Sequence, residues 1–412
     1  MLREIGKRAR AAARKLATTS QETKNKALLA LADALVENAA FIIAENQKDL
    51  IAGRENHLTE ALLDRLSLDE GRILGIANSI RQVVDLPDPV GRVLAERVLP
   101  NGLNLTKVSV PIGVIAVIYE ARPNVTADSA ALCLKSGNVV ILRGGKEAIH
   151  SNIAMCKVMR EALARVGLNE DTIQLIENTD RAVTQALMRL NEYVDVLIPR
   201  GGAGLIRAVV ENATVPVIET GAGTCHIYVD KDADFVMASE IVYNAKTSRP
   251  SVCNAAECLL VHRSVAKEAL PIIAATLASK NVELRGTQEV MEILPDAVPA
   301  TDEDWGKEYN NYIMAVRLVD GVEEAIDFIS QYGTGHSECI VTNNADTAQI
   351  FLSSIDAAAV YHNASTRFTD GGEFGLGAEI GISTQKLHAR GPLGLEELTS
   401  MKYIVRGNGQ VR

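Results

Sequence analysis

Apolar residues recur at helical spacing through the first 85 residues of the chain. Residues 28–50 and 72–84 place apolar side chains three and four positions apart, which is the period of one helix face. A capping-box pair precedes each segment: Thr19 with Glu22, and Ser67 with Glu70. We therefore predict that this part of the chain is helical and ends at the linker DLPDPVG.

The pattern then changes to loose alternation over residues 92–110, around the tripeptide Pro100-Asn101-Gly102. This is typical of a β-hairpin, and Asn-Gly favours the positive φ values of a type I′ turn. A plain surface hairpin is the simplest interpretation. Because an isolated two-stranded ribbon is marginally stable, we expect it to pair with a further element, for which another subunit is a candidate.

From Pro111 onwards, short β-branched runs alternate with amphipathic segments, which indicates a doubly wound α/β domain. Ligands of such domains bind beyond the carboxyl ends of the strands. The expected strands cover residues 112–119, 138–144, 172–178 and 194–199, and the expected helices cover 126–136, 148–167 and 182–191.

The alternation restarts after residue 231, which indicates a second α/β domain. We therefore predict an α/β fold with two doubly wound domains and a small β element. The first domain is expected to cover residues 1–91 and 111–231, the second 232–397, and the β element 92–110 and 398–412.

Composition narrows the class of protein. The 412 residues are 47% hydrophobic and 23% charged, as in ordinary globular proteins, and the net charge is −10 without a basic run, which disfavours nucleic-acid binding. The N-terminal stretch lacks an apolar signal core, so we expect a cytoplasmic protein without a membrane partner. Six cysteines at irregular spacing indicate reduced thiols. The Cys and His residues lack the spacing of a zinc site, so we expect no metal.

Cys253 stands out because it lies among small and polar residues in NAKTSRPSVCNAAEC, whereas Cys133 lies in an apolar run. Lys246 and Arg249 lie close enough in sequence to stabilise a thiolate, the nucleophilic form. Packing is the competing interpretation, because cysteine without a disulfide is among the most buried residue types. Of the other cysteines, we expect Cys258 to compete most for alkylating reagents.

Two predicted strand ends carry glycine turns. In the first, Arg143 and Lys146 flank two glycines; the second has Gly201, Gly202 and Gly204 before a helix. Glycines at such points let a phosphate approach backbone N–H groups. The spacing differs from GxGxxG, so the standard dinucleotide fingerprint is absent, and an ordinary turn is the alternative.

The order of these motifs resembles the aldehyde dehydrogenase superfamily over nearly the whole chain. The matching segments are PIGV at residues 111–114, SGNVV at 136–140 and ETGAG at 219–223, followed at the expected interval by Cys253. The segments EARPNVTADSA, SRPSVCNAAE and FTDGGEFGLGAEIGISTQKLHARGP look like those of the superfamily's acyl-phosphate reductases.

This resemblance implies NADPH-dependent reduction of L-glutamyl 5-phosphate to L-glutamate 5-semialdehyde in proline biosynthesis, through a thioester on Cys253. Oxidation of another semialdehyde with NAD(P)+ is one alternative. A catalytically inactive protein that uses the fold for binding is another. A requirement for phosphate separates the first two.

The resemblance also assigns catalytic and cofactor residues. Asn124 stands near the superfamily's oxyanion-binding Asn, and Glu219 stands where aldehyde-oxidising members activate water, so either proton handling or a structural role is open for it. Arg143 stands where the superfamily usually has a Lys for the adenosine ribose, and Lys146 stands where NAD-preferring members often carry Glu, so the resemblance favours NADPH over NADH. It also implies that Gly201, Gly202 and Gly204 contact the cofactor. Glu308 matches a ribose-binding Glu.

The expected substrate carries a carboxylate and a phosphate, which arginine binds bidentately. The candidates are Arg122, Arg249, Arg367 and Arg390. The bland interpretation of each is a salt bridge that braces a loop. By resemblance, the hairpin and the last strand are oligomerisation elements of a homo-oligomer, and a separate glutamate 5-kinase is a possible partner.

Overall fold

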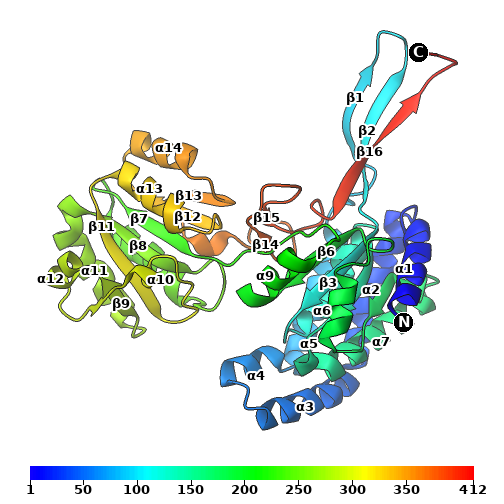
Figure 1. The fold of residues 1–412 in the computed structure, drawn as a ribbon, viewed down its shortest axis with the longest axis horizontal. Coiled ribbons are helices and arrows are strands. Elements are labelled where there is room, and N and C mark those ends of the chain that lie inside the picture. The colour runs from blue at the N-terminus through cyan, green and yellow to red at the C-terminus, as the bar shows by residue number, and fades with distance from the viewer. The chain divides into compact units, whose positions relative to one another are not determined.

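The computed structural model describes residues 1–412, with the side chain of Ala61 excepted, and divides the chain into two compact units (Figure 1). Unit 1 comprises residues 1–220, 375–381 and 392–412, and unit 2 comprises residues 221–374 and 382–391. The chain therefore passes into unit 2 before residue 231. The reason is that strand β7 (Cys225–Val229) pairs with two strands of the unit 2 sheet.

Unit 1 begins with five helices, as the helical spacing predicts. The helices are α1 (Leu2–Leu16), α2 (Gln21–Glu37), α3 (Ala39–Glu55), α4 (Glu60–Leu66) and α5 (Glu70–Asp85). The caps differ slightly from the predicted ones: Ser20 caps α2 and Asp69 caps α5, each accepting a backbone N–H. Among the described residues, no single helix is long and apolar enough to cross a membrane; only the bent pair α2 and α3 passes a test of length and composition.

The predicted strand–helix alternation of unit 1 is confirmed as a parallel four-stranded sheet in the order β5-β4-β3-β6. Its chain order reverses between β3 and β6, which is where such sheets form a crevice at their carboxyl ends. The strands are β3 (Val114–Tyr119), β4 (Val139–Arg143), β5 (Ile173–Leu175) and β6 (Val196–Arg200). The helices are α6 (Asn124–Lys135), α7 (Ile149–Arg165), α8 (Arg181–Leu187) and α9 (Ala203–Asn212).

The predicted hairpin is confirmed, and its further partner is the C-terminal strand of the same chain. Strands β1 (Val93–Val98), β2 (Asn104–Pro111) and β16 (Thr399–Arg406) form an antiparallel sheet with β2 in the centre. The type I′ prediction is wrong: of its two central residues only Gly102 has a positive φ, 84°. A five-residue connection closed by the Leu99 N–H and the Leu103 carbonyl removes that requirement.

Unit 2 holds a seven-stranded sheet in the order β10-β9-β11-β8-β7-β12-β13, and all its pairings are parallel. Besides β7, its strands are β8 (Ala256–His262), β9 (Glu283–Gly286), β10 (Val298–Pro299), β11 (Ile313–Val319), β12 (Ser337–Val341) and β13 (Ala359–His362). Its helices are α10 (Phe235–Thr247), α11 (Ala266–Ala278), α12 (Gln288–Ile293), α13 (Val322–Tyr332) and α14 (Ala345–Ser354). Two short strands follow, β14 (Ile382–Ser383) and β15 (Gly391–Pro392).

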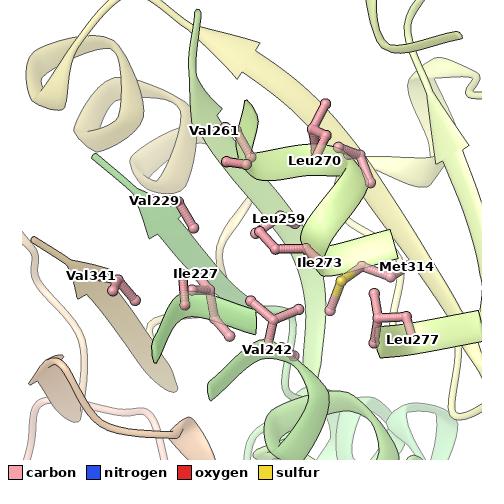
Figure 2. Close-up of a cluster of buried hydrophobic side chains, with 14 of the residues drawn as sticks. Ile227, Val229, Val242, Leu259, Val261, Leu270, Ile273, Leu277, Met314 and Val341 are labelled. Carbon is pink, nitrogen blue, oxygen red and sulfur yellow. The ribbon is translucent and has the colours of Figure 1, made fainter. Parts of the chain in front are cut away.

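Alternating side chains of the unit 2 strands are buried on both faces of the sheet. On one face, Ile227 and Leu259 pack with residues of α10 and α11, as Figure 2 shows. On the other face, Tyr228 and Leu260 pack with residues of α13 and α14. Burial on both faces explains why these strands read as continuous apolar runs in the sequence.

Asn138 of the SGNVV segment joins three parts of unit 1 and is fully buried. Its Oδ1 accepts from the Gly113 N–H at 2.7 Å, at the entry to β3. Its Nδ2 donates to the Leu398 carbonyl at 2.8 Å, just before β16. The amide therefore ties the parallel sheet to the segment that leads into the three-stranded sheet.

Asn138→Leu is expected to destabilise unit 1 by about 1–3 kcal/mol for each backbone group left without a partner. Urea unfolding followed by circular dichroism measures the change as a lower midpoint. Asn212→Leu is the matched control, because Asn212 is exposed and bonds only within its own helix at Ala208. Equal midpoints for the two variants would contradict the linking role of Asn138.

Candidate active site

Cys253 lies at the amino edge of the unit 2 sheet, in the loop between α10 and β8. Because the strands are parallel, the segments that enter them meet at one edge. Gly223 precedes β7 and Glu308 lies in the segment before β11, so both reach this edge. In unit 2 the candidate nucleophile therefore lies at the amino ends of the strands, and not at the carboxyl ends where ligands of doubly wound sheets usually bind.

The backbone of Cys253 is held by direct contact with the segment before β7. A Cβ at Gly223 would overlap the Cys253 carbonyl oxygen, so only glycine fits there. The same carbonyl accepts from the Cys225 thiol at 3.2 Å, and the Gly223 N–H donates to Glu308 Oε1 at 3.1 Å. These contacts bring Cys253, Gly223 and the predicted ribose-binding Glu308 together in one cluster.

Cys253 is the partly exposed cysteine, and the other five are buried. Burial raises the pKa of the Cys156 and Cys339 thiols to about 12, and it also raises the pKa of Cys133, Cys225 and Cys258. The expectation that Cys258 competes for alkylating reagents is therefore wrong, because its strand lies inside the sheet. Only the Cys253 thiol combines exposure with a polar setting.

Two of the four predicted substrate arginines, Arg249 and Arg367, lie in the surroundings of Cys253. The Arg367 guanidinium donates to Ser248 Oγ at 2.9 Å and to Asn254 Oδ1, on the residue next to Cys253. Burial lowers the pKa of Arg367, the charge of Asp370 opposes this, and the charge of Arg249 lowers the pKa further. Two guanidinium groups that repel each other form a favourable setting for an anion.

Lys246 does not supply the charge expected from the sequence. Its side chain is fully buried, and its Nζ lies 2.5 Å from Glu257 Oε2, a carboxylate that is 1% exposed. The ammonium group is therefore neutralised inside the unit. Glu257 was not among the predicted site residues, because a carboxylate at the second position of a strand usually faces solvent.

Arg390 pairs with Asp356, at 2.7 Å between Nη1 and Oδ1, and donates to the Asp356 carbonyl at 2.9 Å. Lys386 binds the same carboxylate. This arrangement fits the loop-bracing interpretation of Arg390. Arg122 and Glu219 belong to unit 1, and both are partly buried.

In unit 1, a carboxylate that the sequence analysis missed lies at the predicted glycine turn. Glu120, which follows β3, accepts from the Gly202 N–H at 2.8 Å. A Cβ at Gly201 would lie 2.6 Å from the same Glu120 oxygen, whereas a Cβ at Gly204 would lie in open space. Packing against Glu120 therefore accounts for the glycine at 201, whereas a side chain would fit at 204.

Arg143 ends β4, and its side chain is buried. Its two terminal nitrogens donate to the Gly144 and Thr179 carbonyls, each at 2.6 Å. Its Nε is without a hydrogen-bond partner among the described residues. Burial lowers the pKa of Arg143, and the charge of Glu147 opposes this. Lys146, three residues on, is exposed.

Asn124 begins α6 and is exposed, and its Nδ2 donates to Asp128 Oδ2 at 3.0 Å. Burial raises the pKa of Asp128 to about 6, against the Asn124 hydrogen bond and the charge of Arg200. Asp128 and Arg200 were not among the predicted residues. The spacing of four between Asn124 and Asp128, on one helix face, was the signal available.

Gly223→Ala is expected to lower the urea midpoint of unfolding, because overpacking costs about 1–3 kcal/mol or more and the overlapped atoms are backbone. The rate at which iodoacetamide labels Cys253 is expected to change as well, since the loop must shift. Gly321→Ala is the control, because its Cβ would meet its nearest neighbour at 3.5 Å. A Gly223→Ala protein that matches this control in both measurements would contradict the contact.

Comparisons with known proteins agree with this architecture. Residues 2–289 match the model of the aldehyde dehydrogenase family. A curated γ-glutamyl phosphate reductase from Clostridium botulinum (strain Alaska E43 / Type E3) is 59% identical over 99% of this chain and 98% of its own length. The crystal structure of γ-glutamyl phosphate reductase from Thermotoga maritima is 50% identical, with a TM-score of 0.97 over 100% of this chain and 99% of that one.

An engineered glycolyl-CoA reductase solved with bound NADP+ shares the fold, with 15% identity and a TM-score of 0.69 over 98% of this chain and 96% of that one. The family model covers more than half of the chain, and the similarity to the first two proteins extends over nearly all of it. The chain therefore belongs to the aldehyde dehydrogenase family, within the branch of the γ-glutamyl phosphate reductases.

Proposed function

We propose that this chain reduces L-glutamyl 5-phosphate to L-glutamate 5-semialdehyde and phosphate with NADPH, through a thioester on Cys253, as a step of proline biosynthesis in the cytoplasm. The two relatives that match over nearly their whole length are γ-glutamyl phosphate reductases, which supports this substrate. The observation that carries the mechanism is the partly exposed Cys253 thiol, with Arg249 and Arg367 in its surroundings.

In the first step, the Cys253 thiolate attacks the acyl carbon, and a carbon–sulfur bond forms. The bond between the acyl carbon and the bridging phosphate oxygen then breaks, and phosphate leaves with the bonding electron pair. Arg249 and Arg367 bind the departing dianion by charge-assisted hydrogen bonds. Backbone N–H groups near Cys253 are the proposed donors to the oxyanion, and the Asn124 amide is the proposed side-chain donor.

NADPH, when bound, supplies the hydride that reduces the thioester carbonyl. The carbon–sulfur bond of the resulting tetrahedral adduct breaks, which releases the semialdehyde and restores the Cys253 thiolate. Water would divert the thioester to glutamate, so this chemistry does not require Glu219 to activate water. For Glu219, a proton-handling role and a structural role both stay open.

The proposed cofactor residues fit a phosphorylated dinucleotide in part. Arg143 and Lys146 put two cations at the end of β4, and the Arg143 Nε is a buried donor without a partner among the described residues. Near Gly201 and Gly202, the Glu120 carboxylate occupies the Gly202 N–H, so a phosphate there needs Glu120 to release it. Gly204 has open space where a side chain would be, and it is the remaining proposed glycine contact. Glu308 is the proposed partner of a ribose hydroxyl.

We also propose that the three-stranded sheet joins copies of the chain into a homo-oligomer. Strand β1 is exposed along its length, and β16 exposes Met401, Tyr403 and Val405. Exposed apolar side chains on edge strands are a typical surface for pairing. Arg122 and Arg390 remain proposed contacts for the substrate, and a glutamate 5-kinase remains a possible donor of glutamyl phosphate.

Cys253→Ser is expected to abolish phosphate-dependent reduction of NADP+ by glutamate 5-semialdehyde, because the hydroxyl is a far weaker nucleophile than a thiolate. Absorbance at the NADPH band measures the rate, and NADP+ binding by the variant is the control for folding. Cys258→Ser, at a buried cysteine, is the matched control and is expected to keep its activity. Near-normal turnover by Cys253→Ser would refute the mechanism, and wild-type turnover without phosphate would instead indicate an ordinary aldehyde dehydrogenase.

Lys146→Glu is expected to raise the KM for NADP+ by about 10-fold or more, equivalent to about 1.4 kcal/mol, since the new carboxylate repels a 2′-phosphate. The KM for NAD+ should change much less. Steady-state kinetics with both cofactors measures the two values. Lys7→Glu, at an exposed position of α1, controls for the change in net charge. An unchanged ratio of the two KM values would contradict the proposal that Lys146 contacts the 2′-phosphate.

A further inference from the structure

A buried ion pair spans the base of the loop that carries Cys253. Lys246 lies in the last turn of α10, and Glu257 is the second residue of β8, so the loop between these two elements starts and ends beside the pair. The two side chains are 0% and 1% exposed, with 2.5 Å between Nζ and Oε2. Their contact therefore fixes the distance between the two ends of the loop.

The same pair contacts the segment that carries Glu308. Glu257 Oε1 accepts from the Asn310 N–H at 3.5 Å, and Lys246 Nζ lies 5.9 Å from the centre of the Tyr309 ring. Tyr309 is held from its other end, because its hydroxyl donates to Asp304 Oδ1 at 2.7 Å. The two residues that follow Glu308 thus have fixed partners.

Glu308 connects the ion pair to Cys253 through Gly223. Its carboxylate accepts from the Gly223 N–H, and Gly223 lies against the Cys253 carbonyl. The pair therefore reaches the Cys253 backbone by two routes, one through the loop ends and one through Glu308 and Gly223. All the contacts lie within unit 2.

Stability alone does not explain this pair. Burial lowers the pKa of Lys246 and raises that of Glu257 to about 7, so the surroundings disfavour both charges. Well-packed apolar residues commonly replace a buried ion pair without loss of stability. Apolar residues would, however, give no acceptor to the Asn310 N–H, although Arg285 and Lys307 would still lie over the Tyr309 ring.

We propose that Lys246 and Glu257 are positioning residues, which hold the Cys253 loop at both ends and orient Glu308 without touching the substrate. The part of this inference that concerns turnover rests on the proposed function. The part that concerns the reactivity of the Cys253 thiol does not.

The test compares wild-type protein with the double variant Lys246→Met/Glu257→Leu, which fills the same space without charges. Asp230→Asn is the matched control: this carboxylate is also buried in unit 2, and it accepts from Tyr228 and Thr342 hydroxyls at the opposite, carboxyl edge of the sheet. Urea unfolding, labelling of Cys253 by iodoacetamide, and kcat and KM for phosphate-dependent NADP+ reduction are measured for each protein.

The double variant is expected to stay folded, to label faster at Cys253 because its loop is loosened, and to lose about 10- to 100-fold in kcat. Its KM for NADP+ is expected to rise, because Glu308, the proposed ribose partner, is no longer held in its orientation. The control is expected to lose stability and keep wild-type labelling and kcat. A folded double variant with wild-type labelling and kcat would overturn the proposal. If wild-type protein shows no phosphate-dependent turnover, the proposed function fails, and the labelling comparison decides the positioning role by itself.

Discussion

The contact between Gly223 and the Cys253 carbonyl is the constraint on which the candidate site depends. It requires a residue without a side chain at the entry to β7, and it brings two loops together at the amino edge of a parallel sheet. Once the backbones meet there, the Cys225 thiol and the Glu308 carboxylate can bond to the two sides of the contact. The Cys253 thiol is thus placed by backbone packing, and the residue stays partly exposed.

The cations around this contact differ in burial and in their partners. The buried cation Lys246 is neutralised by Glu257, whereas Arg249 is exposed and Arg367 bonds to neutral groups. Neutral partners leave the guanidinium charges available to an anion, which a salt bridge would not. In unit 1, Glu120 and Asp128 put carboxylates beside residues proposed to bind a polyanionic cofactor and an oxyanion. Any ligand there must compete with these bonds.

Local sequence patterns were enough to predict most elements of both units, because strand and helix periods are set by burial of nearby side chains. Predictions that depend on distant partners were less successful. Because β7 pairs with β8 and β12, unit 2 begins earlier in the chain than the sequence pattern indicates. Lys246 pairs with Glu257, a carboxylate on the strand that follows the Cys253 loop. Asn101 was misassigned because the loop is longer than a two-residue turn. Cys253 could be singled out as the candidate nucleophile from the sequence, because its polar neighbours are adjacent in the chain.

The most direct test of the account is a rapid-mixing measurement of NADPH formation from glutamate 5-semialdehyde and NADP+ in the absence of phosphate. The proposed thioester mechanism predicts a burst of about one NADPH per active thiol, followed by a stall that added phosphate relieves, because the thioester on Cys253 waits for its acceptor. A reaction without a burst, or steady turnover without phosphate, would contradict it.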